Sequence, residues 1–194
     1  MASVELFEAT ALAPAQAGDA AALAFLAFED FYSIFSRDRS RVLPAVVAQF
    51  ATDSELNQLV AALDDGHVVG IGAYYSAAEM AARQAMGLRL LLEVAEDPGA
   101  CVKGVRAFST NFTPPGDAGA YVSRFAVAES QRGSGVAGLL HAHMESAITR
   151  RGWGRIRLHV RRDNARGLAF YRKLGYVPAD PSDRGYLLLE KPLG

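Results

Sequence analysis

The sequence predicts a single α/β domain with a mixed central β-sheet and helices on both of its faces. Three observations lead to this fold class. Short apolar runs alternate with helical patterns, a glycine-rich loop joins one such run to a helix, and a hairpin signal precedes them. With 194 residues, 51% of them hydrophobic and 21% charged, the chain has the length and composition of one globular domain. It shows no repeat, low-complexity segment or linker, so we assign residues 1–194 to one domain.

The first half of the chain is predicted to supply strands, a hairpin and several helices. Its expected strands are residues 4–7, 59–63 and 67–75, and its expected helices are 19–35 and 39–50. The last two strands flank Asp64-Asp65-Gly66, a typical hairpin turn. Aromatic residues on more than one face of 19–35 indicate a helix that is covered on several sides. Residues 76–119 contain two more helical patterns, which we expect as an insertion between the third and fourth strands.

The second half is predicted to alternate strands and helices around one glycine-rich loop. Its expected strands are residues 121–127, 156–161, 176–177 and 186–189, and its expected helices are 136–151 and 164–174. The first of these helices repeats apolar residues every four positions, at Val136, Leu140, Met144 and Ile148. Asp163-Asn164 is a typical start for the second helix, and Gly175 a typical end.

Bulk chemistry excludes several classes of function. The formal net charge of −1 argues against a nucleic-acid binder steered by charge. A single cysteine, Cys101, excludes an intramolecular disulfide and fits a reducing compartment. A secretory signal would begin with a positively charged region, but no basic residue precedes Arg37. The most apolar run, 20–28, is too short to cross a bilayer. We therefore expect a soluble cytoplasmic protein with no membrane or nucleic-acid partner.

The stretch 124–138, reading RFAVAESQRGSGVAG, predicts an anion site. The first turn of a helix has unpaired N–H groups, and glycines let phosphate oxygens reach the backbone. Residues 133–138 formally match G-x-G-x-x-G, the dinucleotide fingerprint. That interpretation is disfavoured because five residues separate Val127 from Gly133, and because the next strand offers Arg157, His159 and Arg161 rather than an acidic ribose ligand. The nucleoside-triphosphate P-loop pattern is absent from the sequence.

A different motif pair matches better. Arg132, Gly135 and Ala137 satisfy R-x-x-G-x-A, and Asn164 is followed seven residues later by Tyr171. Together, separated by one helix and one strand, these motifs resemble the GNAT acyltransferase superfamily, which uses acetyl-CoA. The resemblance is strong over residues 121–178, and the preceding hairpin and the strand 186–189 fit the order of elements in that fold.

The resemblance implies a binding site for acetyl-CoA, with CoA as product. Residues 132–138 would wrap the CoA pyrophosphate through backbone N–H groups, and residues 125–127 would pair by main chain with the pantetheine arm, in the gap between two splayed strands. A backbone N–H near Val127 would polarise the thioester carbonyl. The cofactor-binding residues expected in this way are Phe125, Ala126, Val127, Arg132, Gly133, Ser134, Gly135, Val136, Ala137, Gly138 and Asn164.

Two proton transfers accompany acetyl transfer to an amine. Tyr171 matches the tyrosine of the family that protonates the leaving thiolate; alternatively its ring simply packs beside Leu168 and Leu174. His159 lies where some ribosomal-protein-acetylating members carry a glutamate base. A histidine with an ordinary pKa near 6.5 is a competent base. Alternatively, His159 is a strand histidine without a catalytic role, either hydrogen-bonded within the fold or exposed to solvent.

The acceptor side is less defined by the sequence. Glu29, Asp30 and Tyr74 are candidate substrate-binding residues for a partly apolar amine, either a small molecule or a peptide. The insertion 76–119 is expected to roof the acceptor site, to cover the apolar N-terminal helix or to form a homodimer surface. His141 and His143 point to different faces of a helix, so we expect surface histidines and no metal.

The predicted activity is therefore acetyl-CoA-dependent N-acetyltransfer by direct attack of a primary amine. The alternatives are transfer of another acyl group, transfer to oxygen, and a CoA-binding sensor or interaction module without turnover.

Overall fold

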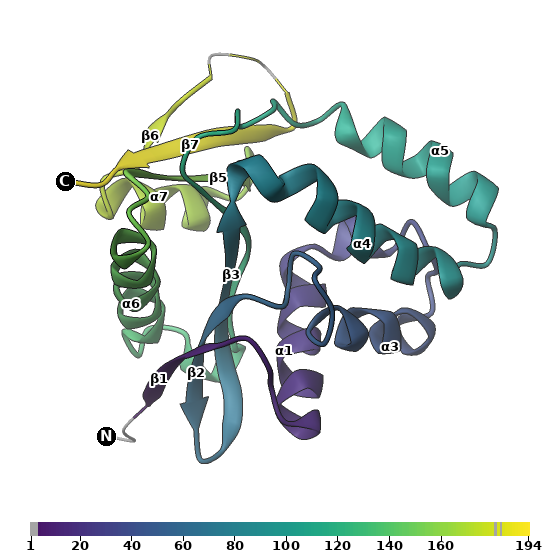
Figure 1. The fold of residues 1–194 in the computed structure, drawn as a ribbon, viewed down its shortest axis with the longest axis horizontal. Coiled ribbons are helices and arrows are strands. Elements are labelled where there is room, and N and C mark those ends of the chain that lie inside the picture. Colours follow the sequence, from purple (N-terminus) through teal and green to yellow (C-terminus); the bar gives the residue numbers. More distant parts are fainter. Residues whose placement is uncertain (1–3, 181, 183) are drawn as a thin grey trace.

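The computed structural model describes residues 4–180, 182 and 184–194, which form one seven-stranded sheet with helices on both faces (Figure 1). The strands are β1 (Glu5–Ala9), β2 (Leu59–Asp64), β3 (His67–Ser76), β4 (Ala120–Val127), β5 (Arg155–Arg161), β6 (Val177–Pro178) and β7 (Tyr186–Pro192). The helices are α1 (Pro14–Ala27), α2 (Glu29–Tyr32), α3 (Arg39–Gln49), α4 (Met80–Glu93), α5 (Pro98–Ser109), α6 (Val136–Arg150) and α7 (Ala165–Lys173), with 3₁₀ turns at Ala77–Glu79 and Glu129–Gln131. The order of strands in the sheet is β1-β2-β3-β4-β5-β7-β6, and the predicted fold class is confirmed.

The two faces of the sheet carry separate hydrophobic cores. On one face, α1, α3 and the insertion helices pack around Phe25, Val46, Ile71 and Leu91. On the other face, α6 and α7 cover a second cluster, which includes the four predicted apolar residues of α6. Figure 1 shows the same division, with α6 and α7 on one side of the strands and α1, α3 and α4 on the other. Burial of both faces explains why residues 59–63 and 67–75 read as nearly continuous apolar runs.

The sheet opens between its two central parallel strands. β4 and β5 pair only where Ala120–Val122 lie beside Ile156–Leu158. Beyond Val122, β4 stays antiparallel to β3, but the register shifts so that Ser123 is an extra residue, a β-bulge. The hydroxyl of Ser123 donates to the carbonyls of Glu55 and Ala73. The C-terminal halves of β4 and β5 therefore diverge, and the edge of β4 that faces β5 is left without a partner strand.

The first predicted helix, 19–35, was wrong at both ends. α1 begins at Pro14, and the side chain of Gln16 accepts from the N–H of Ala13 as a cap. Asp19, the first residue of the predicted helix, lies inside α1 and accepts from the backbone N–H of Val68 at 3.1 Å. The helix then breaks at Phe28, whose φ of −144° is not helical, and α2 follows as a single turn. The break separates the side-chain directions of Phe25 and Phe28, so that only the second ring lines a cavity.

The insertion 76–119 folds as the two predicted helices, with one local difference. Ser76 ends β3 and is the N-cap of the 3₁₀ turn Ala77–Glu79 that leads into α4, but its side chain makes no capping hydrogen bond. Glu79 pairs with Arg83 on the next turn instead. α4 and α5 lie over the same face of the sheet as α1 (Figure 1).

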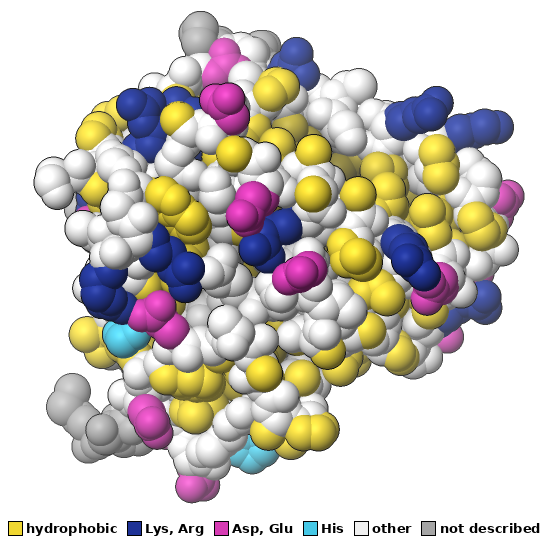
Figure 2. All heavy atoms as spheres, in the orientation of Figure 1, with side chains coloured by type: hydrophobic (Ala, Val, Ile, Leu, Met, Phe, Trp, Pro, Cys, Tyr) yellow, Lys and Arg dark blue, Asp and Glu magenta, His cyan; other side chains and the backbone are white. Residues whose placement is uncertain are grey.

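The charge distribution on the surface and the lengths of the helices can be compared with the partners expected from the sequence, which exclude nucleic acid and membrane. Figure 2 shows acidic and basic side chains interspersed on one face of the molecule, without a continuous basic area there. Within the described part of the chain, every helix falls short of the length and apolar character needed to span a bilayer.

Candidate active site

A cavity of about 570 Å³ passes through the opening between β4 and β5. On the side of α6 and α7 it is lined by Phe125, Leu158, Val160 and Tyr171, which belong to the second core cluster. On the opposite side it is lined by residues of α1, α2, α4, α5 and the loop that follows α5. One cavity thus reaches both faces of the sheet, because the strands that would close it diverge after Val122.

The glycine loop lies at the C-terminal end of β4, where the strands part. Gly133 has a φ of +83° and Gly135 a φ of +91°, conformations that non-glycine residues adopt only with strain. A hydrogen bond ties the loop to the β2–β3 hairpin, because the side-chain amide of Gln131 donates to the carboxylate of Asp64 at 2.8 Å. A Cβ at Gly133, Gly135 or Gly138 would meet no atom within 4 Å, so the backbone here faces open space.

The polar groups of this loop suit a phosphate ligand. Among the backbone hydrogen bonds of the described residues, none uses the N–H groups of Gly133, Gly135 or Ala137. Gly135 is the N-cap of α6 and supplies no capping side chain. Exposed N–H groups at a helix start, with glycines allowing close approach, fit the pyrophosphate of the CoA expected from the sequence. The side chain of Arg132 is half-exposed and pairs with Glu129 on the loop itself.

Asn164 lies where the second diverging strand ends. It caps α7, and its Oδ1 accepts from the N–H of Gly167 at 2.8 Å. Asn164 also lines the cavity. The N-terminus of α7 therefore lies at the cavity, and that of α6 follows the glycine loop after β4.

Tyr171 points into the cavity from α7. Burial raises the pKa of its hydroxyl above the ordinary value, so the group stays protonated over the physiological range. Its ring packs edge-on to Phe125 of β4, at 6.2 Å between centroids. A protonated phenol beside the opening has the form required of a general acid, and the packing alternative is also satisfied, since 8% of the residue is exposed.

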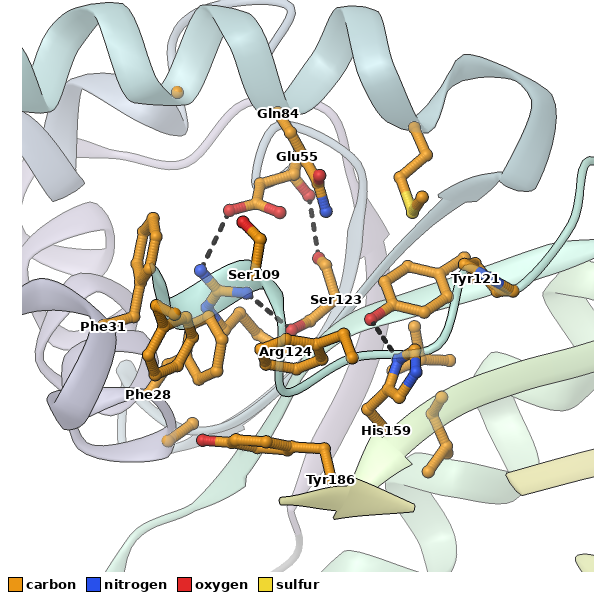
Figure 3. A pocket seen from close by; sticks show the side chains of 18 of the residues that line it. Phe28, Phe31, Glu55, Gln84, Ser109, Tyr121, Ser123, Arg124, His159 and Tyr186 are labelled. Atoms are coloured by element: carbon orange, nitrogen blue, oxygen red, sulfur yellow. Dashed lines mark hydrogen bonds and ion pairs between the residues drawn. The ribbon is translucent and has the colours of Figure 1, made fainter. Parts of the chain in front are cut away.

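His159 also lines the cavity, and both of its ring nitrogens form hydrogen bonds, of which Figure 3 shows the one to Tyr121. Its Nε2 is 2.9 Å from the carbonyl oxygen of Thr113, which can only accept, so Nε2 carries the proton. Its Nδ1 then accepts from the hydroxyl of Tyr121, also at 2.9 Å. Burial lowers the pKa of His159 to about 4. The imidazole is thus neutral and has no free lone pair for an amine, so the prediction of His159 as the direct base does not fit this geometry.

The structure adds a buried ion pair that the sequence analysis missed. Arg124 of β4 donates from Nη2 to Oε1 of Glu55 at 2.9 Å and to the hydroxyl of Tyr32 at 3.2 Å. Both charged side chains are at most 8% exposed, and both line the cavity. Burial alone would lower the pKa of Arg124, but Glu55 and Tyr32 raise it above its ordinary value. Figure 3 shows the carboxylate above the guanidinium, with Ser109 beside it.

Only Oε1 of Glu55 is engaged in this pair. Among the described side-chain hydrogen bonds, none involves Oε2 of Glu55. An oxygen with an unused lone pair, belonging to a largely buried carboxylate on the wall of a cavity, is well placed to accept a proton from a bound amine. No sequence pattern indicates Glu55, which precedes β2 in a loop 69 residues from its partner Arg124.

The candidate acceptor residues are not brought together. Glu29 and Asp30 are exposed and lie at a shallower hollow of about 350 Å³ beside the cavity, where Asp30 pairs with Arg161 at 2.6 Å. Tyr74 lies on the other face of the sheet, under Trp153 and Arg151, and is 1% exposed. The prediction that Tyr74 contacts the acceptor does not fit this placement, because the alternation of β3 turns its side chain away from the cavity.

The histidines of α6 differ from the expectation of two surface residues. His141 is 1% exposed, and its Nε2 lies 2.9 Å from the hydroxyl of Tyr176. Burial lowers its pKa to about 4. His143 is only partly buried. Across residues 4–180, 182 and 184–194, no group of three His, Cys, Asp or Glu side chains is arranged to hold a metal ion.

Comparison with known families identifies the class of protein. The sequence profile of the acetyltransferase (GNAT) family matches residues 21–176. The chain therefore belongs to the GNAT acetyltransferase family, as its motifs suggested. A search of curated protein sequences gives no significant match.

Solved structures with the same fold are similar over nearly the full chain. An N-acetyltransferase from Staphylococcus aureus Mu50 is 18% identical, with a TM-score of 0.71 over 95% of this chain and 100% of that one. A PaiA N-acetyltransferase from Thermoplasma acidophilum, solved in complex with coenzyme A, is 15% identical, with a TM-score of 0.56 over 98% and 99%. A protein from Pyrococcus horikoshii OT3, PH1933, is 11% identical, with a TM-score of 0.66 over 99% of both chains. At these identities the likeness shows the fold alone.

Proposed function

We propose that the protein is an acetyl-CoA-dependent N-acetyltransferase that acetylates a primary amine by direct attack. The observation that carries the proposal is the cavity through the opening between β4 and β5, which is lined from both faces of the sheet, together with the glycine loop that follows the C-terminal end of β4. A long donor and a separate acceptor then approach from opposite sides of one sheet. Membership of the GNAT family and the coenzyme A complex of the Thermoplasma acidophilum protein support this donor.

The donor end follows from backbone geometry. Gly133, Gly135 and Ala137 supply N–H groups to the pyrophosphate, and the unpaired edge of residues 125–127 supplies main-chain partners to the pantetheine amides. Acetyl-CoA supplies an activated thioester. An N–H on this strand edge is the donor available to polarise its carbonyl.

The proton transfers are assigned to two side chains on different walls. The ammonium form of the acceptor gives up one proton to Oε2 of Glu55, which leaves a neutral amine with a lone pair. The new N–C bond forms as the C–S bond breaks, and the thiolate takes a proton from the hydroxyl of Tyr171. The second proton of the nitrogen restores the Tyr171 hydroxyl, and Glu55 gives up the first proton, so both side chains return to their starting state. The products are an amide and CoA, and one proton is released to solvent.

Burial and a neighbouring charge both favour the neutral amine. A cavity that excludes water lowers the pKa of an amine, and so does a nearby positive charge. Arg124 supplies that charge next to Glu55. The positive charge of Arg124 therefore favours the neutral form of the amine, and Oε2 of Glu55 is the acceptor within reach of its proton.

The experiment that tests this proposal combines donor binding with turnover. Purified protein is titrated with CoA and, as a control, NADPH, and its melting temperature is followed. Release of free thiol from acetyl-CoA is then measured with a panel of amines. The proposal expects stabilisation by CoA and thiol release with at least one amine. Stabilisation by CoA without turnover on any amine would favour the sensor module, and stabilisation by NADPH alone would contradict the donor.

A further inference from the structure

The acceptor half of the cavity combines an aromatic wall with one acidic group. Its rings come from segments far apart in the sequence: Phe28, Phe31, Phe108, Phe112 and Tyr186. Phe112 stacks on Tyr186 at 4.2 Å between centroids, and Phe28 meets Phe108 edge-on at 5.4 Å. Since each ring also lines the cavity, the wall presents aromatic faces and edges to whatever binds there.

Charge inside the cavity is limited and almost balanced. Of the described residues that line it, the charged ones are Glu55, Arg124 and Arg161. Arg161 is held at the rim by Asp30 and Asp163. The guanidinium of Arg124 donates hydrogen bonds to Glu55, Tyr32 and the carbonyl of Ser123. Glu55 is therefore the one acidic side chain in the described lining, and its Oε2 is left without a hydrogen bond, so it can accept from one ligand amine.

The acidic group and the aromatic wall are adjacent. The Arg124 guanidinium carbon lies 4.2 Å from the centroid of Phe28, and its Nη2 lies 2.9 Å from Oε1 of Glu55. The carboxylate and the Phe28 ring therefore contact the same guanidinium group. A ligand that contacts both needs its charge and its ring within a short linker of each other. Figure 3 shows this arrangement, with Phe28 and Phe31 to one side of Glu55 and Tyr121 to the other.

The cavity is roofed and small. Met80, Gln84, Leu88 and Leu91 of α4 lie across it, together with Ser109 and Phe108 of α5. A volume of about 570 Å³ lies within the range of about 300–1,000 Å³ usual for small-molecule pockets, and the end of the donor must share it. An acceptor of one or two rings fits the space that remains.

We infer that the acceptor is an arylalkylamine, a single primary amine on a short linker to an uncharged aromatic group, with the amine at Glu55 and the ring against the aromatic wall. This inference rests on the proposed N-acetyltransfer and specifies its substrate class. A polyamine would bring further charges into a space with one free carboxylate oxygen. An amino acid would place its own carboxylate beside Glu55, where like charges repel.

The first experiment measures binding with a matched series of ligands. Protein saturated with CoA is titrated by calorimetry with 2-phenylethylamine and tryptamine, then with n-hexylamine, 2-phenylethanol, phenylalanine and spermidine. Loss of the ring or of the amine should weaken binding about tenfold or more, because each removes one of the two contacts. The same order is expected for kcat/KM in thiol release.

The second experiment changes one wall at a time. Phe108→Leu should reduce kcat/KM for 2-phenylethylamine about tenfold while changing that for n-hexylamine less than threefold. Phe7→Leu is the matched control, because Phe7 is partly buried in β1 but does not line the cavity. Glu55→Gln should lower kcat about 100-fold for every amine while leaving the binding of 2-phenylethanol unchanged, which also shows that the variant is folded.

The outcomes separate the two levels of the proposal. Preference for spermidine or phenylalanine over 2-phenylethylamine, or equal effects of Phe108→Leu on ring and alkyl amines, would overturn the arylalkylamine inference and leave N-acetyltransfer standing. Binding of CoA without acetylation of any amine would overturn the proposed function itself.

Discussion

The two ends of the cavity are built in different ways. The donor end comes from one continuous stretch, β4 to the first turn of α6, joined by the start of α7, and it offers mainly backbone groups. The acceptor end is assembled from α1, α2, the loop at Glu55, α4, α5 and β7, and it offers side chains. A ligand common to a whole family can be held by backbone, which is nearly independent of sequence. A ligand specific to one protein must be recognised by side chains that only the tertiary fold brings together.

The largest effect is expected where the two ends meet, at Tyr171. Replacing Tyr171 with Phe should lower kcat on the order of 10²–10⁴-fold with little change in the KM for acetyl-CoA, because the ring still packs while the proton donor is lost. Steady-state thiol release measures both constants. Tyr176→Phe is the matched control, since Tyr176 is a buried neighbour whose hydroxyl bonds to His141 rather than facing the cavity. Equal losses in the two variants would mean that packing, not proton transfer, is affected.

The next effect tests whether the acceptor end is held by charge. Glu55→Ala leaves the Arg124 guanidinium buried without its carboxylate, and removing one member of a buried pair typically costs about 3–5 kcal/mol. Chemical denaturation should show a loss of this order. Glu8→Ala removes a partner of Arg150 at the exposed surface and should cost less than about 1 kcal/mol. A small loss for Glu55→Ala would show that water already solvates Arg124.

A third prediction isolates the backbone character of the donor end. Gly135 and Gly152 both have positive φ, +91° and +75°, and a Cβ at either would meet no atom within 4 Å. Substitution by Ala should therefore cost similar stability, roughly 1–2 kcal/mol, at each position. Only Gly135→Ala should also weaken CoA binding, about tenfold, because its Cβ enters the space assigned to the pyrophosphate. If Gly135→Ala and Gly152→Ala bind CoA with equal affinity in calorimetry, the pyrophosphate does not lie against the backbone at Gly135.

The same contrast explains what the sequence was able to predict. The glycine loop, Asn164 and Tyr171 lie within 50 residues and carry local motifs, so their places in the fold could be predicted. Glu55 has no local signal, because its role depends on Arg124, which the sequence analysis includes only as the first residue of the stretch 124–138. Tyr74 was predicted to contact the acceptor, but the alternation of side chains along β3 places it on the other face of the sheet, against Trp153. The end of α1 before Phe28 has no counterpart in the spacing of apolar residues along the sequence.

The smallest expected effect is on the pH dependence of stability and concerns His159. The sequence predicts that this residue is a base, whereas in the fold both of its ring nitrogens are hydrogen-bonded. Burial lowers its pKa from about 6.5 to about 4, so the unfolded chain binds more protons than the folded one between these values. Its contribution to stability is therefore complete above pH 6.5 and is lost as the pH falls toward and through 4.

The substitution His159→Gln should reduce the slope of unfolding free energy against pH in that window, and His141→Gln should do the same independently, because burial lowers the pKa of His141 to about 4 as well. The kcat profile of His159→Gln should keep its shape between pH 6 and 8, since the imidazole stays neutral there. A lost limb near pH 6.5 would instead return His159 to the role of base, and the bonds to Thr113 and Tyr121 would then have to open when the amine binds.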